Sequence, residues 1–355
     1  MAWIRNIEIL QSGKTDSYEV EYEIASEVYI QGLLNYKEGM ILCGPMTFEK
    51  DHRGLYKYLL KIRFASADVS SSVKNATKKG YLFKEGIPGE LLALFSLYFE
   101  CRFYMLTSFF GELSHSSLKS KLEFNPVYRP CHPLLAQTIF STRIRSFTSG
   151  FPDFLNKIAH LDTKYHQKLI LACFHYSRAL REFGIDEEMV FIRLVSAIEA
   201  VSKWAKLQKG DDFFNGKEFE KIIRIELLSN EEVAELKRLF DVRKPRIKFK
   251  RFIQQHSRGF FKGGKVRAPH TKIRKADLEK TLNAIYDSRS NYLHNGEAMY
   301  LSHLMRGGLK WDTDPSLGMI IDKRRFPRSK KLPYGSFFQR LVRHCLLEFI
   351  KDISL

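Results

Sequence analysis

The segment from residue 278 to 296, "LEKTLNAIYDSRSNYLHNG", constrains the fold because it reads as one helix with a charge in its apolar face. At about 100° per residue, its large apolar side chains fall on one stripe: Leu278, Leu282, Ile285, Tyr292 and Leu293. Arg289 falls at the centre of that stripe. A guanidinium stays charged, so its burial without a partner is costly. We therefore expect a packed helix in which a neighbouring acid, a ligand phosphate or water compensates Arg289.

His294 follows in the last turn of this helix, directly before Asn295 and Gly296. Glycine is the usual residue just past a helix C-terminus, and the negative end of a helix favours an imidazolium. A histidine that moves a proton beside a cation that holds a phosphate suits phosphodiester cleavage without a metal. On an ideal helix, however, Arg289 and His294 point about 140° apart. They converge if the helix loosens at its end or if two copies share one cleft.

The R-x-x-x-x-H spacing is weak evidence by itself. "RFIQQH" places Arg251 and His256 at the same spacing inside a basic segment, and an isolated arginine–histidine pair is more often structural than catalytic. The apolar helical face and the capping glycine distinguish Arg289 and His294 from that second pair.

The rest of the chain indicates an α+β fold with two domains. Residues 1–155 read as a mixed α/β accessory domain, with strands at "SYEVEYEIASEVYIQGLL" and "GLYKYLLKIRFASADV". The segment after "PGE" is a helix or a buried strand, and periodicity does not decide between them. Residues 117–137 read as an ordered loop. From residue 156 to 355 the patterns are helical, with a capping box predicted from Ser229 to Glu232, and they indicate an all-α bundle.

Charge favours a polyanionic partner. The chain has 58 Lys and Arg against 40 Asp and Glu, a formal net charge of +18. A basic segment at about 237–275 reads as a loop inserted in the bundle, in which "GFFKGG" is expected to be mobile, and Phe249, Phe252, Phe260 and Phe261 are interleaved in it. Cations and aromatic rings together suit single-stranded nucleic acid. The cations expected to bind RNA are Arg246, Lys248, Lys250, Arg251, Lys262, Lys265 and Arg267. The alternative is a solvated loop whose phenylalanines pack inwards.

Several classes of protein are not indicated. The start of the chain lacks the pattern of a signal peptide. The most apolar segment, 91–110, carries Glu100 and Arg102, as expected for a core element rather than a membrane span. The five cysteines lack metal-site spacing, so we expect buried thiols in the cytoplasm. No metal and no cofactor are expected. A DNA-binding regulator has weaker support, because no helix-turn-helix spacing with a basic recognition helix is present.

The motif "SRSNYLHNGE" and the upstream "FIRLVSAIEAVSKW" resemble the HEPN superfamily (higher eukaryotes and prokaryotes nucleotide-binding), whose signature is R-x(4–6)-H on a late helix of a bundle. The resemblance covers about 160–355, is strongest over 189–204 and 282–297, and is closest to the prokaryotic phage-defence and toxin branch. It implies a metal-independent endoribonuclease acting on single-stranded RNA as a homodimer with a composite cleft. The RNA 2′-hydroxyl would attack the adjacent phosphate, leaving a 2′,3′-cyclic phosphate. The alternative is a non-catalytic HEPN-type RNA-binding or assembly module.

The resemblance also implies roles for single residues. His294 would transfer protons, Arg289 would stabilise the phosphate, and Ser290 and Asn291 would orient either group. Glu199 is the candidate acid for holding Arg289, with a surface glutamate as the alternative, and Asp287 is a second supporting residue. Two positions depart from the family pattern. Ser290 stands where the family has Asn, Asp or His most often. Gly296 stands where toxins controlled by a nucleotidyltransferase have Tyr, so that control is not expected.

Overall fold

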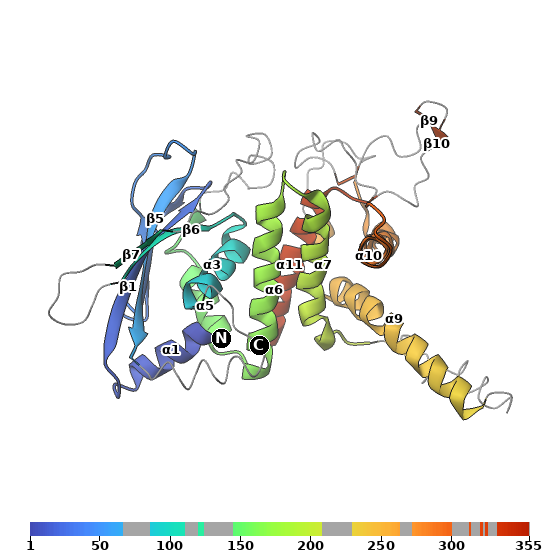
Figure 1. Ribbon diagram of the computed structural model, residues 1–355, viewed down its shortest axis with the longest axis horizontal. Helices are drawn as coiled ribbons and strands as arrows, with labels where there is room; N and C mark the ends of the chain where they lie inside the picture. The colour runs from blue at the N-terminus through green and yellow to red at the C-terminus, as the bar shows by residue number, and fades with distance from the viewer. Residues whose placement is uncertain are drawn as a thin grey trace. The chain divides into compact units, whose positions relative to one another are not determined.

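The computed structural model describes residues 1–66, 86–110, 120–123, 145–207, 229–262, 272–299, 312–313, 320–321, 324–325 and 332–354 (Figure 1). The chain divides into two compact units. The first comprises Met1–Asp186 with Ile350–Leu355, and the second comprises Glu187–Phe349. The division therefore falls after Asp186, whereas the sequence suggested a boundary near residue 155. Both helices and an antiparallel sheet are present, so the α+β class is confirmed.

The first unit is built on an antiparallel six-stranded sheet with the order β3-β4-β5-β1-β6-β7. Its strands are β1 (Ser17–Ser26), β3 (Leu34–Tyr36), β4 (Ile41–Pro45), β5 (Tyr56–Ala65), β6 (Tyr104–Phe110) and β7 (Ser120–Glu123). Strands β1 and β5 pair along their whole length, Ser17 opposite Ala65, and confirm the two predicted strand segments. Strand β7 pairs with β6, so residues 120–123 are not the loop expected there. The short strands β2 (Ile30–Gln31) and β8 (Arg145–Ser146) pair in parallel.

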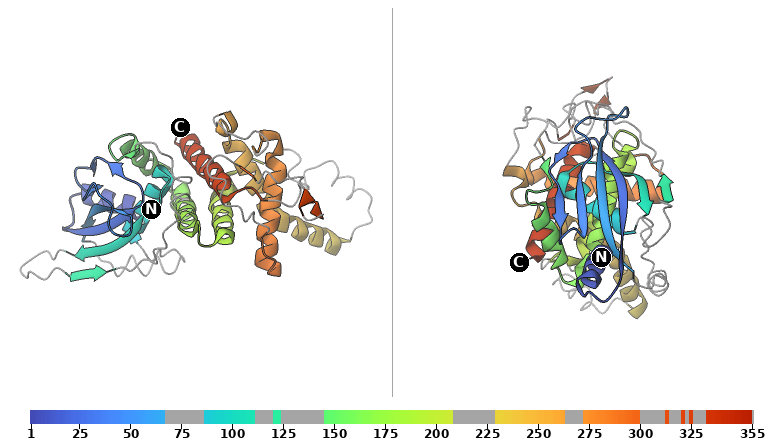
Figure 2. Two further views of the ribbon diagram at one scale, coloured as in Figure 1. Left: turned by 90° about the horizontal axis from the view of Figure 1, so that it is seen from above. Right: turned by 90° about the vertical axis from the view of Figure 1, so that its left-hand side faces the viewer.

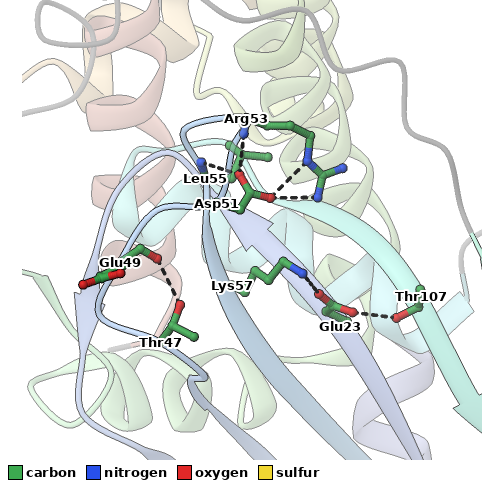
Figure 3. Close-up of polar contacts among 8 residues, drawn as sticks. All are labelled: Glu23, Thr47, Glu49, Asp51, Arg53, Leu55, Lys57 and Thr107. Atoms are coloured by element: carbon green, nitrogen blue, oxygen red, sulfur yellow. Dashed lines mark hydrogen bonds and ion pairs between the residues drawn. The ribbon is translucent and has the colours of Figure 1, made fainter.

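Side chains alternate across this sheet as expected for one buried and one polar face. Along β1, Val20, Tyr22 and Ile24 are buried. The intervening glutamates pair with cations of β5, such as Glu23 with Lys57 at 2.6 Å (Figure 3). Helices α1 (Ala2–Gln11), α3 (Gly86–Phe99) and α5 (Phe151–Ala159) lie on one side of the sheet (Figures 1 and 2). Helix α6 (Thr163–Glu182) packs against α3.

The apolar segment that sequence periodicity left undecided forms helix α3 and then strand β6. Helix α3 is buried on nearly every side, which is why its apolar residues show no single stripe. It contributes a buried carboxylate: Glu90 accepts hydrogen bonds from the backbone N–H groups of Ala2 and Trp3, both at 3.1 Å. Burial raises the pKa of Glu90, although these hydrogen bonds act in the opposite direction.

The turn between β4 and β5 is organised by one carboxylate. Asp51 Oδ1 accepts hydrogen bonds from the backbone N–H groups of Arg53 (2.9 Å) and Leu55 (3.1 Å), and its Oδ2 binds the Arg53 guanidinium (Figure 3). Burial alone would raise the pKa of Asp51, but these hydrogen bonds outweigh it and lower the pKa. The turn therefore depends on the ionised carboxylate.

The second unit is mainly helical. Its longer helices are α7 (Glu187–Val201), α9 (Asn230–His256), α10 (Leu278–Asn295) and most of α11 (Gly335–Ile353). Short 3-10 turns occur at η1 (Ser202–Trp204), η3 (Phe260–Lys262) and η5 (Lys275–Asp277), and strands β9 (Ile320–Ile321) and β10 (Arg324–Arg325) pair. Helices α7, α9 and α10 contact one another pairwise. Aromatic pairs such as Phe191 with Phe338 and Phe252 with Phe349 fill the core.

Most of the basic segment is helical, which corrects the expectation of a loop there. Helix α9 runs unbroken from Asn230 to His256 with Pro245 inside it, so "RFIQQH" lies on a helix. The predicted capping box at Ser229 and Glu232 starts the helix. Phe249, Phe252 and Ile253 then give it a fully buried apolar side at helical spacing, which ties it into the core. Residues 263–271, the end of the predicted insertion, lie outside the described residues.

Candidate functional site

Helix α10 carries the arginine–histidine motif and contacts both α7 and α9 (Figure 1). Leu278, Leu282 and Ile285 are buried as the stripe predicted. Leu293 is exposed, contrary to that pattern, because the last turn of the helix lies outside the apolar core. The predicted C-terminus is confirmed: Gly296 has φ of 67°, and its N–H bonds to the carbonyl of Asn291.

Arg289 is compensated by an acid from a neighbouring helix. Its Nη2 donates to Glu199 Oε2 of α7 at 3.1 Å, and the two side chains are 19% and 23% exposed. The partner suggested for Arg289 in the sequence is therefore its partner in the structure. Arg289 Nε is also buried, and it has no hydrogen-bond partner among the residues that the structure describes.

Tyr286 joins this pair, and the sequence interpretation did not include it. Its hydroxyl donates to Glu199 Oε1 at 3.0 Å, and its ring lies 5.9 Å from the Arg289 guanidinium carbon. The ring also packs against Phe249 of α9, with centroids 5.4 Å apart. Burial, and then the negative charge of Glu199, raise the pKa of Tyr286 to about 12, so the phenol remains a donor at neutral pH. The available signal was its position one turn before Arg289 on the same face.

His294 is exposed in the last turn of α10. Within the described parts of the chain, no hydrogen bond or ion pair joins it to Arg289, as expected from their separation around the helix. Ser290 is half-buried, and Asn291 is exposed and donates to Glu297 Oε2 at 3.1 Å. One chain thus presents the arginine and the histidine on different sides of one helix.

Two cations expected to bind RNA are paired with acids of α10. Arg246 forms two contacts with the Asp287 carboxylate, at 2.9 and 3.0 Å, and a third with Asn283 at 3.2 Å. Lys250 lies 3.1 Å from Glu279. These contacts link α9 to α10, so a phosphate at either cation would have to compete with a carboxylate. Asp287 therefore contacts Arg246 rather than Arg289.

The other cations expected to bind RNA differ in their exposure to solvent. Lys248 is half-buried, Lys262 is exposed, and Arg251 donates to Gln254 at 3.0 Å. Lys265 and Arg267 lie outside the described residues. So do most residues of a second basic stretch, "DKRRFPRSKK" at 322–331, which the sequence adds to the cations expected to bind RNA.

The interleaved aromatic residues do not form a common surface. Phe249 and Phe252 are fully buried, so the expectation that they stack on nucleic-acid bases is wrong. Their helical spacing faces them into the core, as in the alternative of phenylalanines that pack inwards. Phe260 and Phe261 are half-buried in η3, where Phe260 packs on Phe337 at 5.7 Å.

The described part of the chain shows neither a cluster of metal ligands nor an exposed free thiol. There, no group of three or more His, Cys, Asp or Glu side chains could hold a metal ion. Cys43, Cys101, Cys173 and Cys345 are buried free thiols, as predicted, while Cys131 lies outside that part. Burial raises their pKa values, which leaves them weakly reactive. No described helix is long and apolar enough to cross a lipid bilayer.

Comparison with protein-family models, with curated proteins and with solved structures gives no match to this chain. The assignment of a function therefore depends on the residues of α7, α9 and α10.

Proposed function

We propose that this chain is a metal-independent endoribonuclease of HEPN type that cleaves single-stranded RNA as a homodimer in the cytoplasm, in phage defence or as a toxin. The observation that carries the proposal is the half-buried Arg289, held by Glu199 of a neighbouring helix and followed five residues later by the exposed His294. The net charge of +18 supports a polyanionic substrate.

In the proposed reaction, the 2′-hydroxyl of the RNA attacks the adjacent phosphorus and the bond from phosphorus to the 5′ oxygen breaks. One His294 accepts the 2′-hydroxyl proton, and the His294 of a second copy donates a proton to the leaving 5′ oxygen. Arg289 stabilises the negative charge that builds on the phosphoryl oxygens. Ser290 and Asn291, adjacent on α10, orient the phosphate. Two copies are needed because one helix turns Arg289 and His294 away from each other.

A second candidate is a non-catalytic RNA-binding or assembly module. The ion pairs of Arg246 with Asp287, Lys250 with Glu279 and Arg289 with Glu199 favour it, because each assigns a cation a structural partner. In that case Arg289 and His294 would affect stability or assembly without cleavage.

The test is cleavage of a labelled single-stranded RNA in EDTA by the wild-type protein, His294→Ala and Arg289→Ala. His256→Ala is the matched control, because this histidine ends a second R-x-x-x-x-H sequence on another helix. The proposal expects 2′,3′-cyclic phosphate ends from the wild type and this control, and loss of cleavage in both α10 variants. RNA binding without cleavage, unchanged in His294→Ala, would instead support the second candidate.

A further inference from the structure

The carboxylate of Glu199 is shared between two donors of one helix. Its Oε1 accepts the Tyr286 hydroxyl at 3.0 Å, and its Oε2 accepts Arg289 Nη2 at 3.1 Å. A carboxylate with a directed donor on each oxygen is held in one orientation, because rotation of the group would break both bonds. The orientation of Glu199 therefore depends on Tyr286.

The orientation of Arg289 depends in turn on Glu199. The bond from Nη2 is the hydrogen bond that fixes the guanidinium among the described residues, since the buried Nε makes none there. The Tyr286 ring lies beside the guanidinium but supplies only a diffuse attraction at 5.9 Å. If the carboxylate turned, the guanidinium would lose its directional restraint.

Tyr286 is itself held rigidly. Its backbone belongs to α10, its ring packs on the buried Phe249 of α9, and its hydroxyl reaches α7. Support of a functional group by a packed side chain with a directed hydrogen bond is what maintains geometry within fractions of an ångström.

We propose that Tyr286 is a positioning residue: through Glu199 it fixes the guanidinium of Arg289 in the orientation that phosphate stabilisation requires. The consequence for catalysis rests on the ribonuclease function proposed above. The effect on Arg289 itself does not depend on any activity.

The decisive variant is Tyr286→Phe, which removes one oxygen atom and leaves the ring in place. Tyr292→Phe is its matched control, a half-buried tyrosine on the same helix. With single-stranded RNA, Tyr286→Phe is expected to lower kcat about tenfold with KM little changed, because the lost restraint acts on the transition state. Glu199→Gln should lower kcat at least as much. The kcat of the double variant Tyr286→Phe with Glu199→Gln should be no lower than that of Glu199→Gln alone, because both changes affect Arg289 through the same carboxylate.

A second readout needs no RNA. Phenylglyoxal modification of Arg289, followed by mass spectrometry, is expected to be several-fold faster in Tyr286→Phe than in the wild type and in Tyr292→Phe. The exposed Arg258 serves as an internal standard. Equal modification rates of Arg289 in wild type and Tyr286→Phe would overturn the positioning proposal. Additive kcat losses in the double variant would also overturn it. So would an unchanged kcat in Tyr286→Phe when the wild type cleaves RNA. Faster modification in a protein that cleaves no RNA would support the positioning and overturn the ribonuclease function.

Discussion

Replacement of Arg102 by methionine should destabilise the first unit strongly. Arg102 Nη2 lies 2.5 Å from Glu27 Oε1, and the two side chains are 1% and 7% exposed. Tyr104 also donates to Glu27, at 3.3 Å. Removal of one member of a buried ion pair leaves the other charge uncompensated and costs about 3–5 kcal/mol. Since a domain is stable by about 5–15 kcal/mol in total, this loss would be a large share of the stability.

The double variant Glu27→Gln with Arg102→Met separates the charge from the packing. It removes both charges and keeps an acceptor for Tyr104, so it should recover most of the loss. Arg63→Met is the matched control on the sheet's polar face, because Arg63 and Glu19 are 38% and 37% exposed. That change should cost less than about 1 kcal/mol. The assay is native-state hydrogen exchange of β1 and β5 peptides, which reports the opening free energy of this unit by itself.

The same pair predicts a dependence on pH. Burial raises the pKa of Glu27, although Arg102 acts in the opposite direction. A folded-state pKa above the unfolded value means that protonation favours the folded state, so the carboxylate costs stability as pH rises through these values. Without Arg102 the pKa of Glu27 should rise further, and the deficit of Arg102→Met should narrow from pH 7.5 to pH 5. A loss below about 1 kcal/mol in Arg102→Met, or a double variant no more stable than the single one, would refute this reasoning.

Three further substitutions test the turn between β4 and β5, the C-terminus of α10 and the ion pair between α9 and α10. Asp51→Ala should cost about 1 kcal/mol of stability. Hydrogen bonds outweigh burial and lower the pKa of Asp51 in the folded state. The stability that the Asp51 carboxylate contributes is therefore fully present above its unfolded-state pKa and is lost as pH falls through its folded-state pKa. The urea midpoint should accordingly fall less between pH 6 and pH 3 in the variant than in the wild type. Gly296→Ala should cost about 1 kcal/mol in thermal unfolding, because φ of 67° is unfavourable for alanine, and Gly296→Asn should cost less. Asp287→Asn should tighten RNA binding two- to threefold, on the order of 0.5 kcal/mol, if Arg246 contacts phosphate, and unchanged affinity would remove Arg246 from the RNA-binding residues.

Local patterns in the sequence were sufficient for several elements. The alternation along β1 and β5 predicted two strands that do pair, and the capping box at Ser229 and the glycine at 296 predicted a helix start and a helix end. Each of these signals acts over a few residues, through side-chain direction, a hydrogen bond to a nearby N–H group, or the φ angle of one residue. The apolar stripe on α10 correctly predicted burial at Leu278, Leu282 and Ile285, where the helix is packed. It was incorrect at Leu293, because the last turn of the helix is not packed.

Only the tertiary structure decided which charges meet. Arg289 bonds to Glu199, 90 positions away, and Arg246 bonds to Asp287, 41 positions away. The sequence alone established that Arg289 needed a partner, and it offered Glu199 through a family resemblance. It also suggested that Arg246 and Lys250 bind RNA and that Phe249 and Phe252 stack on bases. The net charge of the segment did not reveal the acids of α10 that pair with both cations. The interpretation of Phe249 and Phe252 failed, because burial is a property of the packed helices and not of the residue type.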